Sequence, residues 1–263
     1  MKKIVIFLVL VLSVSAANAW VKHCEEAVVI LASENLTPET KALLDKYLGE
    51  KYNDDVQYLY ALEKAKKAQH TSEIHFLHLN KKLQPKRVKG DDAYAAIEKA
   101  LAVVAKHESH SKEEVVVALR TIINLMSDIH HVSNVRIDKI EHSKADFKYQ
   151  FPTSEMGKGR KKFSTHAWSK TWHSYNYYPA GFSAQFRAYD LKVYLGDRFA
   201  EFSNGSLKDW AKETGALAKS YLATFKPDAI VGLVERLSLN DVNNEQMVKA
   251  SCRLAALLNS TLK

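Results

Sequence analysis

The chain has 263 residues, of which 46% are hydrophobic, and 38 lysines and arginines against 30 acidic residues give it a formal net charge of +8. This composition excludes a disordered protein, because disordered chains have too few apolar residues, and a fibrous protein, because fibrous chains have a strongly biased composition. The length is compatible with one domain or two. The chain has two cysteines, Cys24 and Cys252, so it cannot depend on a disulfide framework.

The first nineteen residues have the pattern of an export signal. Lys2 and Lys3 precede an apolar run over residues 4–14, and Ala17-Asn18-Ala19 has the small-x-small pattern that signal peptidases recognise. The run is shorter than the roughly 20 residues that cross a bilayer as a helix. We therefore predict a signal peptide over residues 1–19 and a secreted or periplasmic mature domain over residues 20–263, with no stable membrane anchor.

Helical signals dominate the mature chain. Residues 93–106 are rich in strong helix formers, and residues 245–258 carry apolar side chains at helical spacing. Ser111-Lys112-Glu113-Glu114 and Ser206-Leu207-Lys208-Asp209 are capping boxes, each of which predicts the start of a helix. Residues 134–140 are compatible with a short isolated strand. The sequence thus predicts an all-α or mainly α fold in a single domain.

Residues 145–179 are less regular and combine basic with aromatic side chains. The basic residues lie between Lys158 and Lys162, and the aromatic residues are Phe163, Trp168, Trp172, Tyr175, Tyr177 and Tyr178. One interpretation is a groove in which rings stack on bases and cations follow the phosphates. The other is a loop whose aromatic rings cover the core.

Several side chains of metal-binding type stand out. Asn124, Asp128 and His131 are separated by four and three positions, so they share one face of a helix. Asp54 and His75 precede them, and His and Asp groups on helices are typical zinc ligands of phosphoesterases. Cleavage before Trp20 would add an α-amine, which is much less basic than a lysine and can bind a metal.

Taken in order, these residues carry a family resemblance. The matching features are the N-terminal Trp20, the segments Tyr52-Asn53-Asp54-Asp55, His75-Phe76 and Ser127-Asp128-Ile129-His130, and the terminal segment 253–259. The mature chain resembles the single-strand-specific zinc nucleases of the S-one/P-one type, which share their helical fold with bacterial zinc phospholipase C. This resemblance implies a multi-helix domain that binds three zinc ions and hydrolyses single-stranded nucleic acid and 3′-nucleotides.

The resemblance also assigns roles to individual residues. It implies that Trp20, Asp54, His75 and Asp128 are zinc ligands, that Asp54 orients the attacking water, and that Phe76 stacks on a base. Glu25 stands where the family has a histidine, and it could bind a metal through oxygen. His173 matches part of a further ligand pair, and His131 or His166 could replace the ligands lost there.

Other family positions are substituted. Two ligand histidines are replaced by Asn124 and Asn134, and a third ligand position falls on Ser169. Gln57 occupies the position of a phosphate-binding arginine, and His78 that of a base-reading carboxylate. Two hypotheses follow. The chain is either a secreted zinc-dependent phosphoesterase with a depleted metal site, holding one to three zinc ions and acting on single-stranded nucleic acid or nucleotides, or an inactive member that binds a ligand or is structural.

The two cysteines leave two further possibilities open. In an oxidising compartment Cys24 and Cys252 could link the first and last helices by a disulfide. Alternatively, each is a small residue of the core.

Overall fold

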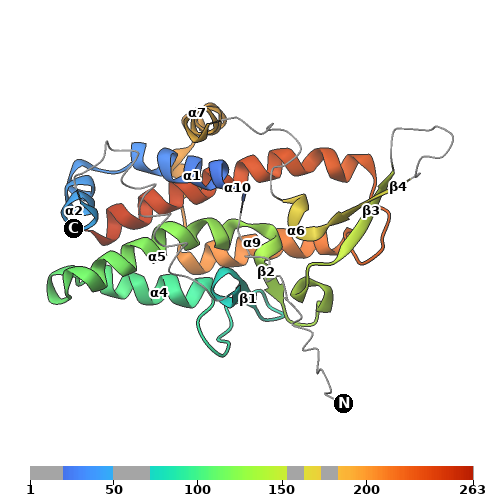
Figure 1. The fold of residues 1–263 in the computed structure, drawn as a ribbon, viewed down its shortest axis with the longest axis horizontal. Coiled ribbons are helices and arrows are strands. Elements are labelled where there is room, and N and C mark those ends of the chain that lie inside the picture. Colours follow the sequence, from blue (N-terminus) through green and yellow to red (C-terminus); the bar gives the residue numbers. More distant parts are fainter. Residues whose placement is uncertain (1–19, 50–71, 153–162, 173–182, 263) are drawn as a thin grey trace, which may run out of the picture.

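Helices make up most of the part of the chain that the structure describes, and the longest of them run along one axis (Figure 1). The computed structural model describes residues 20–49, 72–152, 163–172 and 183–262, and the structural statements below concern these ranges. The helices are α1 (Lys22–Glu34), α2 (Pro38–Leu48), α4 (Ala93–Val104), α5 (Lys112–His130), α6 (Trp168–Thr171), α7 (Ala184–Leu195), α8 (Phe199–Ser203), α9 (Leu207–Thr224) and α10 (Leu233–Thr261). The prediction of a mainly α fold is confirmed.

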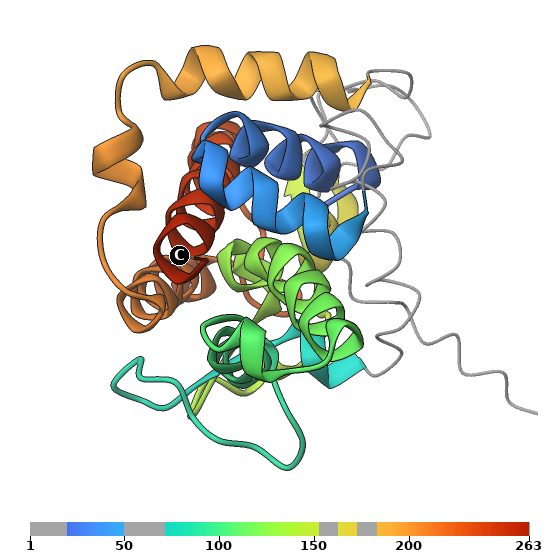
Figure 2. The ribbon, with the colours of Figure 1, turned by 90° about the vertical axis from the view of Figure 1, so that its left-hand side faces the viewer.

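The helices pack in layers. In Figure 1, α4, α5, α9 and α10 lie roughly along the long axis, and α1 lies against α10. Figure 2 shows α7 crossing the outer side of α1, with α8 leading from α7 down to α9. No helix of the described ranges is both long enough and apolar enough to cross a membrane. The predicted signal peptide lies outside those ranges.

Both predicted capping boxes are present. The Ser111 hydroxyl accepts a hydrogen bond from the Glu114 amide at 3.2 Å, and the Glu114 carboxylate accepts one from the Ser111 amide at 2.9 Å. Ser206 and Asp209 make the same reciprocal bonds at the start of α9. These bonds satisfy amide groups that have no partner within the helix, which is why α5 and α9 begin where the sequence predicts.

The prediction of an irregular segment after residue 145 is wrong in part. Strands β3 (Lys148–Pro152) and β4 (Phe163–Ala167) form an antiparallel pair, in which Lys148 lies opposite Ala167. Alternate residues of β3, Tyr149 and Phe151, are buried in the core, so the strand follows from a period of two over five residues. The strand expected within residues 134–140 is β2 (Val135–Ile137), which is not isolated because it pairs in parallel with β1 (Leu77–Leu79).

The aromatic residues near the hairpin divide between core and undescribed segments. Trp168 is 1% exposed and Trp172 is fully buried, and their rings meet edge to face at 5.4 Å. For these two rings the core interpretation is confirmed, and the base-stacking interpretation is wrong. Phe163 is partly exposed. The basic residues between Lys158 and Lys162, with Tyr175, Tyr177 and Tyr178, lie outside the described residues.

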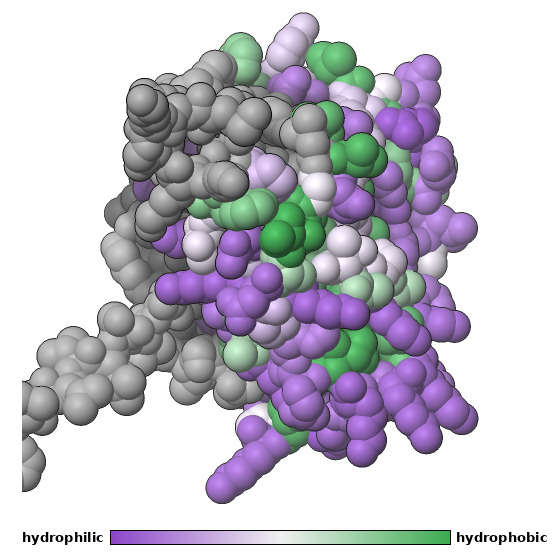
Figure 3. Space-filling model, turned by 90° about the vertical axis from the view of Figure 1, so that its right-hand side faces the viewer, coloured by the Kyte–Doolittle hydropathy of each residue, from purple (hydrophilic) through white to green (hydrophobic). Residues whose placement is uncertain are grey.

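Figure 3 looks onto the end of the molecule where β3, β4 and the start of α10 lie, and it shows apolar patches separated by hydrophilic side chains. The exposed large apolar residues of these elements and of the segment before α10 are Phe163, Ile230, Val234 and Leu237. Three more belong to α7, namely Phe186, Tyr189 and Val193. Single exposed apolar residues are normal on protein surfaces.

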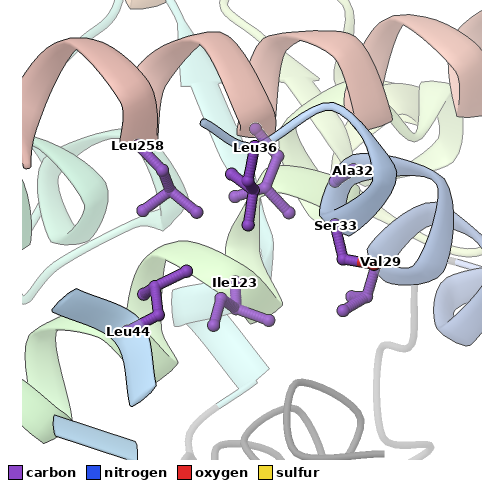
Figure 4. Close-up of a pocket in the computed structure, with 8 residues that line it drawn as sticks. Val29, Ala32, Ser33, Leu36, Leu44, Ile123 and Leu258 are labelled. Carbon is purple, nitrogen blue, oxygen red and sulfur yellow. The ribbon is translucent and has the colours of Figure 1, made fainter. Parts of the chain in front are cut away.

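The core between α1, α2, α5 and α10 is tightly packed. A small pocket that the described residues form in this core is drawn in Figure 4 and has a volume of about 10 Å³. Apart from Ser33, whose hydroxyl donates to the Ile30 carbonyl at 2.7 Å, its lining is apolar. A cavity of this size and lining offers no ligand site, since it is about as large as one water probe and has no polar partners for water.

Cys24 and Cys252 belong to the apolar cluster between α1, α7 and α10. Both are buried thiols, and they are not joined in a disulfide. Burial raises the pKa of Cys252 to about 12, which makes this thiol a poor nucleophile. The core interpretation of the two cysteines therefore describes this structure.

A buried charged network joins α5, α9 and α10. Arg253 donates to His130 Nε2 at 3.0 Å and to the Phe202 carbonyl at 3.0 Å, and it pairs with Glu213. Lys249 also pairs with Glu213. Arg253 is 3% exposed, so these partners supply the opposite charge and the acceptors that a buried cation requires.

His130 is neutral in this network. Its Nδ1 donates to the Met126 carbonyl at 2.8 Å, which leaves Nε2 as the acceptor for Arg253. Complete burial, the positive charge of Arg253 and, more weakly, that of Lys249 hold the pKa of His130 well below its usual range. Protonation of His130 would remove the acceptor and place two cations side by side.

The buried, neutral His130 makes the stability of the protein depend on pH. Because the folded-state pKa of His130 is depressed, its contribution to stability is complete above the unfolded-state pKa of about 6.5 and is lost as the pH falls below it. Compared with His130→Gln, the wild-type protein should lose up to about 1.4 kcal/mol of unfolding free energy per pH unit below that point. Urea unfolding between pH 7 and 5 measures the difference, and parallel curves for the two proteins would contradict it.

Gly215 in α9 allows a close approach of β1. A Cβ at this position would lie 2.2 Å from Leu79 Cδ1, and Leu79 is buried in the core. We expect Gly215→Ala to lose about 1–2 kcal/mol, because overpacking outweighs the gain in helix propensity. The neighbouring Ala216 is exposed, so Ala216→Gly is the matched control and tests propensity alone. Thermal unfolding measures both, and a stabilised Gly215→Ala protein would refute the close contact.

Candidate functional site

The end of α5 gathers several of the predicted residues around Asp128. Asp128 lies in the last turn of α5 and is 3% exposed. Its Oδ2 lies 2.9 Å from Nδ1 of His75, the last residue of the short helix η1 (Ser72–His75). Its Oδ1 accepts a hydrogen bond from Asn134 Nδ2 at 2.8 Å. An ionised carboxylate only accepts, so both oxygens of Asp128 are engaged by donors.

The backbone after α5 explains why Asn134 reaches Asp128. The helix ends at His130, and the amide of the next residue, His131, donates to the Asp128 carbonyl at 3.1 Å. A short 3₁₀ turn, η3 (Val132–Asn134), then reverses the chain and returns Asn134 to the helix end. The six-residue spacing between Asp128 and Asn134 is therefore a product of the helix end and this turn.

Trp20 and Glu25 lie next to the same helix end. The Trp20 ring meets the His131 ring edge to face, with the centroids 5.2 Å apart, and its indole N–H donates to Asn243 Oδ1 at 3.1 Å. The backbone nitrogen of Trp20 donates to Glu25 Oε1 at 3.2 Å. Trp20 and Glu25 are 1% and 3% exposed, so both are held inside the protein. Four residues that the resemblance assigns to the metal site, Trp20, Glu25, His75 and Asp128, are thus all near the end of α5.

Phe76 is covered on one side by a residue that the sequence analysis missed. The guanidinium carbon of Arg136 lies 3.9 Å from the centre of the Phe76 ring, and Arg136 Nη1 donates to the Ser133 carbonyl at 2.8 Å. In the β1–β2 pair, Arg136 lies opposite His78, whose amide donates to Asp92 Oδ2 at 3.0 Å. The cation stacks on the ring at a distance typical of a cation–π contact. Nothing in the sequence indicates this contact, since it depends on strand register.

The other predicted residues lie on or just after α5, in or beside the β3–β4 hairpin, or outside the described residues. Asn124 is buried on α5, one turn before Asp128. His131 Nδ1 lies 3.0 Å from the Ser133 hydroxyl. His166 belongs to the hairpin, where its ring packs on Phe151, and Ser169 binds Asp146 with both its amide and its hydroxyl. Asp54, Gln57 and His173 lie outside the described residues.

The described residues near Asp128 supply few of the ligands that a zinc ion needs. A zinc site uses about four ligands from His, Cys, Asp or Glu side chains. Within the described part of the chain, no three such side chains come together in a way that could hold a metal. His75 Nδ1 contacts Asp128 Oδ2, and the Asn134 side-chain amide donates to Asp128 Oδ1. The described residues therefore do not complete a zinc site by themselves.

Comparison with protein-family models and with curated proteins gives no match to this chain. The resemblance to the zinc nucleases therefore depends on the residue pattern and not on an overall match.

The geometry predicts that Asp128 is important for stability. Asp128→Ala would leave the buried His75 and Asn134 groups without their acceptor, and we expect a loss of about 2–5 kcal/mol. Asp138→Ala is the control, because Asp138 pairs with Lys86 on the surface at 2.9 Å and should contribute far less. Urea unfolding at equal m-value measures both variants. Equal losses would mean that the Asp128 cluster is not a structural centre.

Proposed function

We propose that this chain binds single-stranded nucleic acid or nucleotides at the site beside Asp128 and does not hydrolyse them with zinc. One observation carries the proposal: both oxygens of Asp128 are satisfied by His75 and Asn134. In the nucleases that the chain resembles, this carboxylate bridges two zinc ions. Here an amide and an imidazole stabilise its charge within the protein.

Phe76 and Arg136 are the residues proposed to contact the ligand. Both are half-buried. Phe76 follows His75 in the chain, and Arg136, which lies opposite His78 in the β1–β2 pair, covers the Phe76 ring. Stacking of a base on an aromatic ring contributes about 1–3 kcal/mol, and it does not depend strongly on sequence. A guanidinium group supplies several N–H donors that suit a phosphate. The excess of basic residues in the chain also favours an anionic partner.

The substitutions argue against efficient hydrolysis. Stabilisation of the developing charge is usually the largest contribution to catalysis of this kind. Asn124 and Asn134 replace imidazole ligands with amides, which are poor zinc ligands, and Gln57 lacks the positive charge of an arginine. These substitutions favour binding of the ligand without turnover over hydrolysis.

A second candidate function is the secreted zinc-dependent phosphoesterase. The placement of Trp20, Glu25, His75 and Asp128 around one helix end favours it, because these residues come from three separate segments of the sequence. Asp54 and His173 would then supply further ligands, with Asp54 as the catalytic carboxylate. Measurements of zinc retention, oligonucleotide binding and chelator-sensitive turnover separate the two candidates.

The proposal predicts binding without metal-dependent turnover. The protein that begins at Trp20, dialysed after exposure to zinc, should retain fewer than about one zinc ion per chain. It should bind a single-stranded oligonucleotide in fluorescence anisotropy, and Phe76→Ala should weaken binding at least about fivefold because a stacking contact is lost. Chelator should not change the breakdown of single-stranded DNA, RNA or a 3′-nucleotide.

A restored variant provides the control. The double variant Asn124→His/Asn134→His has an imidazole at both positions. If the asparagines are the cause of low zinc affinity, this variant should retain more zinc than the wild-type protein. Stoichiometric zinc in the wild-type protein, with chelator-sensitive turnover that Asp128→Ala abolishes, would contradict the proposal and establish the phosphoesterase. Absence of both binding and turnover, for the oligonucleotide and for a 3′-nucleotide, would exclude both candidates.

A further inference from the structure

The segment between β1 and α4 carries a dense group of positive charges. Residues 80–90, the basic loop, contain no acidic residue and have five exposed cations: Lys81, Lys82, Lys86, Arg87 and Lys89. Figures 1 and 2 show this loop extending away from the helices. A surface with charges of one sign raises the local concentration of oppositely charged partners, so the basic loop favours an anion.

Hydrogen bonds hold the first part of the basic loop in one conformation. Asn80 Oδ1 accepts from the amides of Lys82 at 2.8 Å and Gln84 at 3.1 Å, and the Asn80 amide donates to the Gln84 carbonyl at 2.9 Å. Pro85 then forms an antiparallel bridge to Leu79 of β1. Cations on an ordered backbone lose less conformational entropy on binding than cations on a disordered segment, so the loop is preorganised.

The small sheet connects the basic loop to the site at Phe76. Arg136 lies opposite His78 in the β1–β2 pair, and on the other side of β1 the Lys86 amide donates to the His78 carbonyl at 2.9 Å. The next residue of β1, Leu79, is buried, so the alternation along the strand places His78 on the outer face. Arg136, His78 and Lys86 therefore form a row across this face, which spans two strand spacings or about 10 Å.

The acidic residues near the basic loop have partners within the protein. Asp138 pairs with Lys86 at 2.9 Å, and Asp91 pairs with Lys99 at 2.7 Å. Asp92 is 2% exposed and accepts hydrogen bonds from two backbone amides. The other four cations of the basic loop form no ion pair within the described ranges, so their charge is available to a partner.

A cavity lies between the last part of the basic loop, the first turns of α4 and the start of α9. Its volume is about 560 Å³, and its lining includes Arg87, Tyr94 and Lys208. Of its three acidic residues, two are the paired or buried aspartates described above, and Glu98 interacts with the Tyr94 hydroxyl. Sites for small ligands have volumes of roughly 300–1,000 Å³, so this cavity has room for one nucleotide beside two cations.

We propose that the basic loop binds the phosphate backbone of single-stranded nucleic acid. This inference rests on the function proposed above and extends it, because it makes an oligonucleotide of several nucleotides, and not a mononucleotide, the preferred ligand. Phosphate contacts supply affinity and position the strand without reading its sequence. Within the basic loop, which the structure describes throughout, no large apolar side chain is exposed that could insert into a lipid surface.

The test removes three charges from the basic loop in the protein that begins at Trp20. The variant Lys82→Gln/Arg87→Gln/Lys89→Gln keeps Lys86 and its ion pair. Fluorescence anisotropy with a labelled oligothymidylate of about twelve nucleotides, between roughly 50 and 200 mM salt, measures the affinity and its salt dependence. We expect the affinity at the lowest salt to fall on the order of tenfold or more. The slope of log affinity against log salt should become shallower by about 2, since each phosphate contact of a single strand contributes about 0.7.

A mononucleotide should not respond to the same change. Thymidine 3′-monophosphate can occupy the site at Phe76 without reaching the basic loop, so its affinity, measured by competition with the oligonucleotide, should be equal in the wild-type protein and the basic-loop variant. A mononucleotide affinity that falls as much as the oligonucleotide affinity would overturn the proposal, because the loop would then not act on the longer ligand alone.

Three exposed lysines away from the basic loop supply the matched control. Lys106 follows α4, Lys112 begins α5, and Lys219 lies in the second half of α9. The variant Lys106→Gln/Lys112→Gln/Lys219→Gln loses the same total charge and should bind the oligonucleotide almost as the wild-type protein does. Equal losses in the two variants would overturn the proposal. A basic-loop variant that loses binding to vesicles of anionic phospholipid but keeps its affinity for the oligonucleotide would do so too.

The same titrations separate this inference from the proposed function. If Phe76→Ala weakens oligonucleotide binding and the basic-loop variant does not, the inference is wrong and the proposed function stands. If the basic-loop variant weakens binding and Phe76→Ala does not, the proposed site is wrong and the phosphate-binding surface stands. A wild-type protein that does not bind the oligonucleotide would overturn the inference and the proposed binding function together.

Discussion

The burial of one carboxylate, Asp128, constrains the whole site. A carboxylate that is 3% exposed must be supplied with donors, and His75 and Asn134 supply them. His75 fixes the segment that leads into β1, and Asn134 fixes the turn that leads into β2. The parallel pairing of these strands then places Arg136 over Phe76. The arrangement of the proposed ligand-binding residues thus follows from the need to stabilise one negative charge.

The end of α5 uses two successive histidines in different ways. His130 is the last residue of α5, whereas His131 caps the helix with an extended backbone, so the two side chains meet different neighbours. His130 faces α10 and accepts from Arg253, whereas His131 packs on Trp20. The first belongs to the buried charged network that holds α5, α9 and α10 together, and the second connects the site to the N-terminal helix. Because both histidines are buried, neither is a surface residue, although the sequence alone does not distinguish their roles.

The sequence predicted best what is decided locally. The capping boxes at Ser111 and Ser206 predicted helix starts, because their bonds lie within four residues. The hairpin and the cover of Phe76 by Arg136 were missed, since both depend on which strands pair and in which register. The contacts of the buried residues near the end of α5 were not predictable either, because they join distant parts of the sequence: Asn243, which binds Trp20, lies 223 positions away.

The departures from the nuclease pattern are of one physical kind. In a metal site, zinc would neutralise Asp128 and bind the N-terminal amine. In this chain Asn134 donates to Asp128, and Glu25 accepts from the Trp20 amide nitrogen. The Asn134 amide is a donor that suits the Asp128 carboxylate, and the Glu25 carboxylate is an acceptor that suits the Trp20 N–H. The contacts of His75 and Asn134 therefore stabilise the buried Asp128 carboxylate from within the protein, which is consistent with the binding function proposed above.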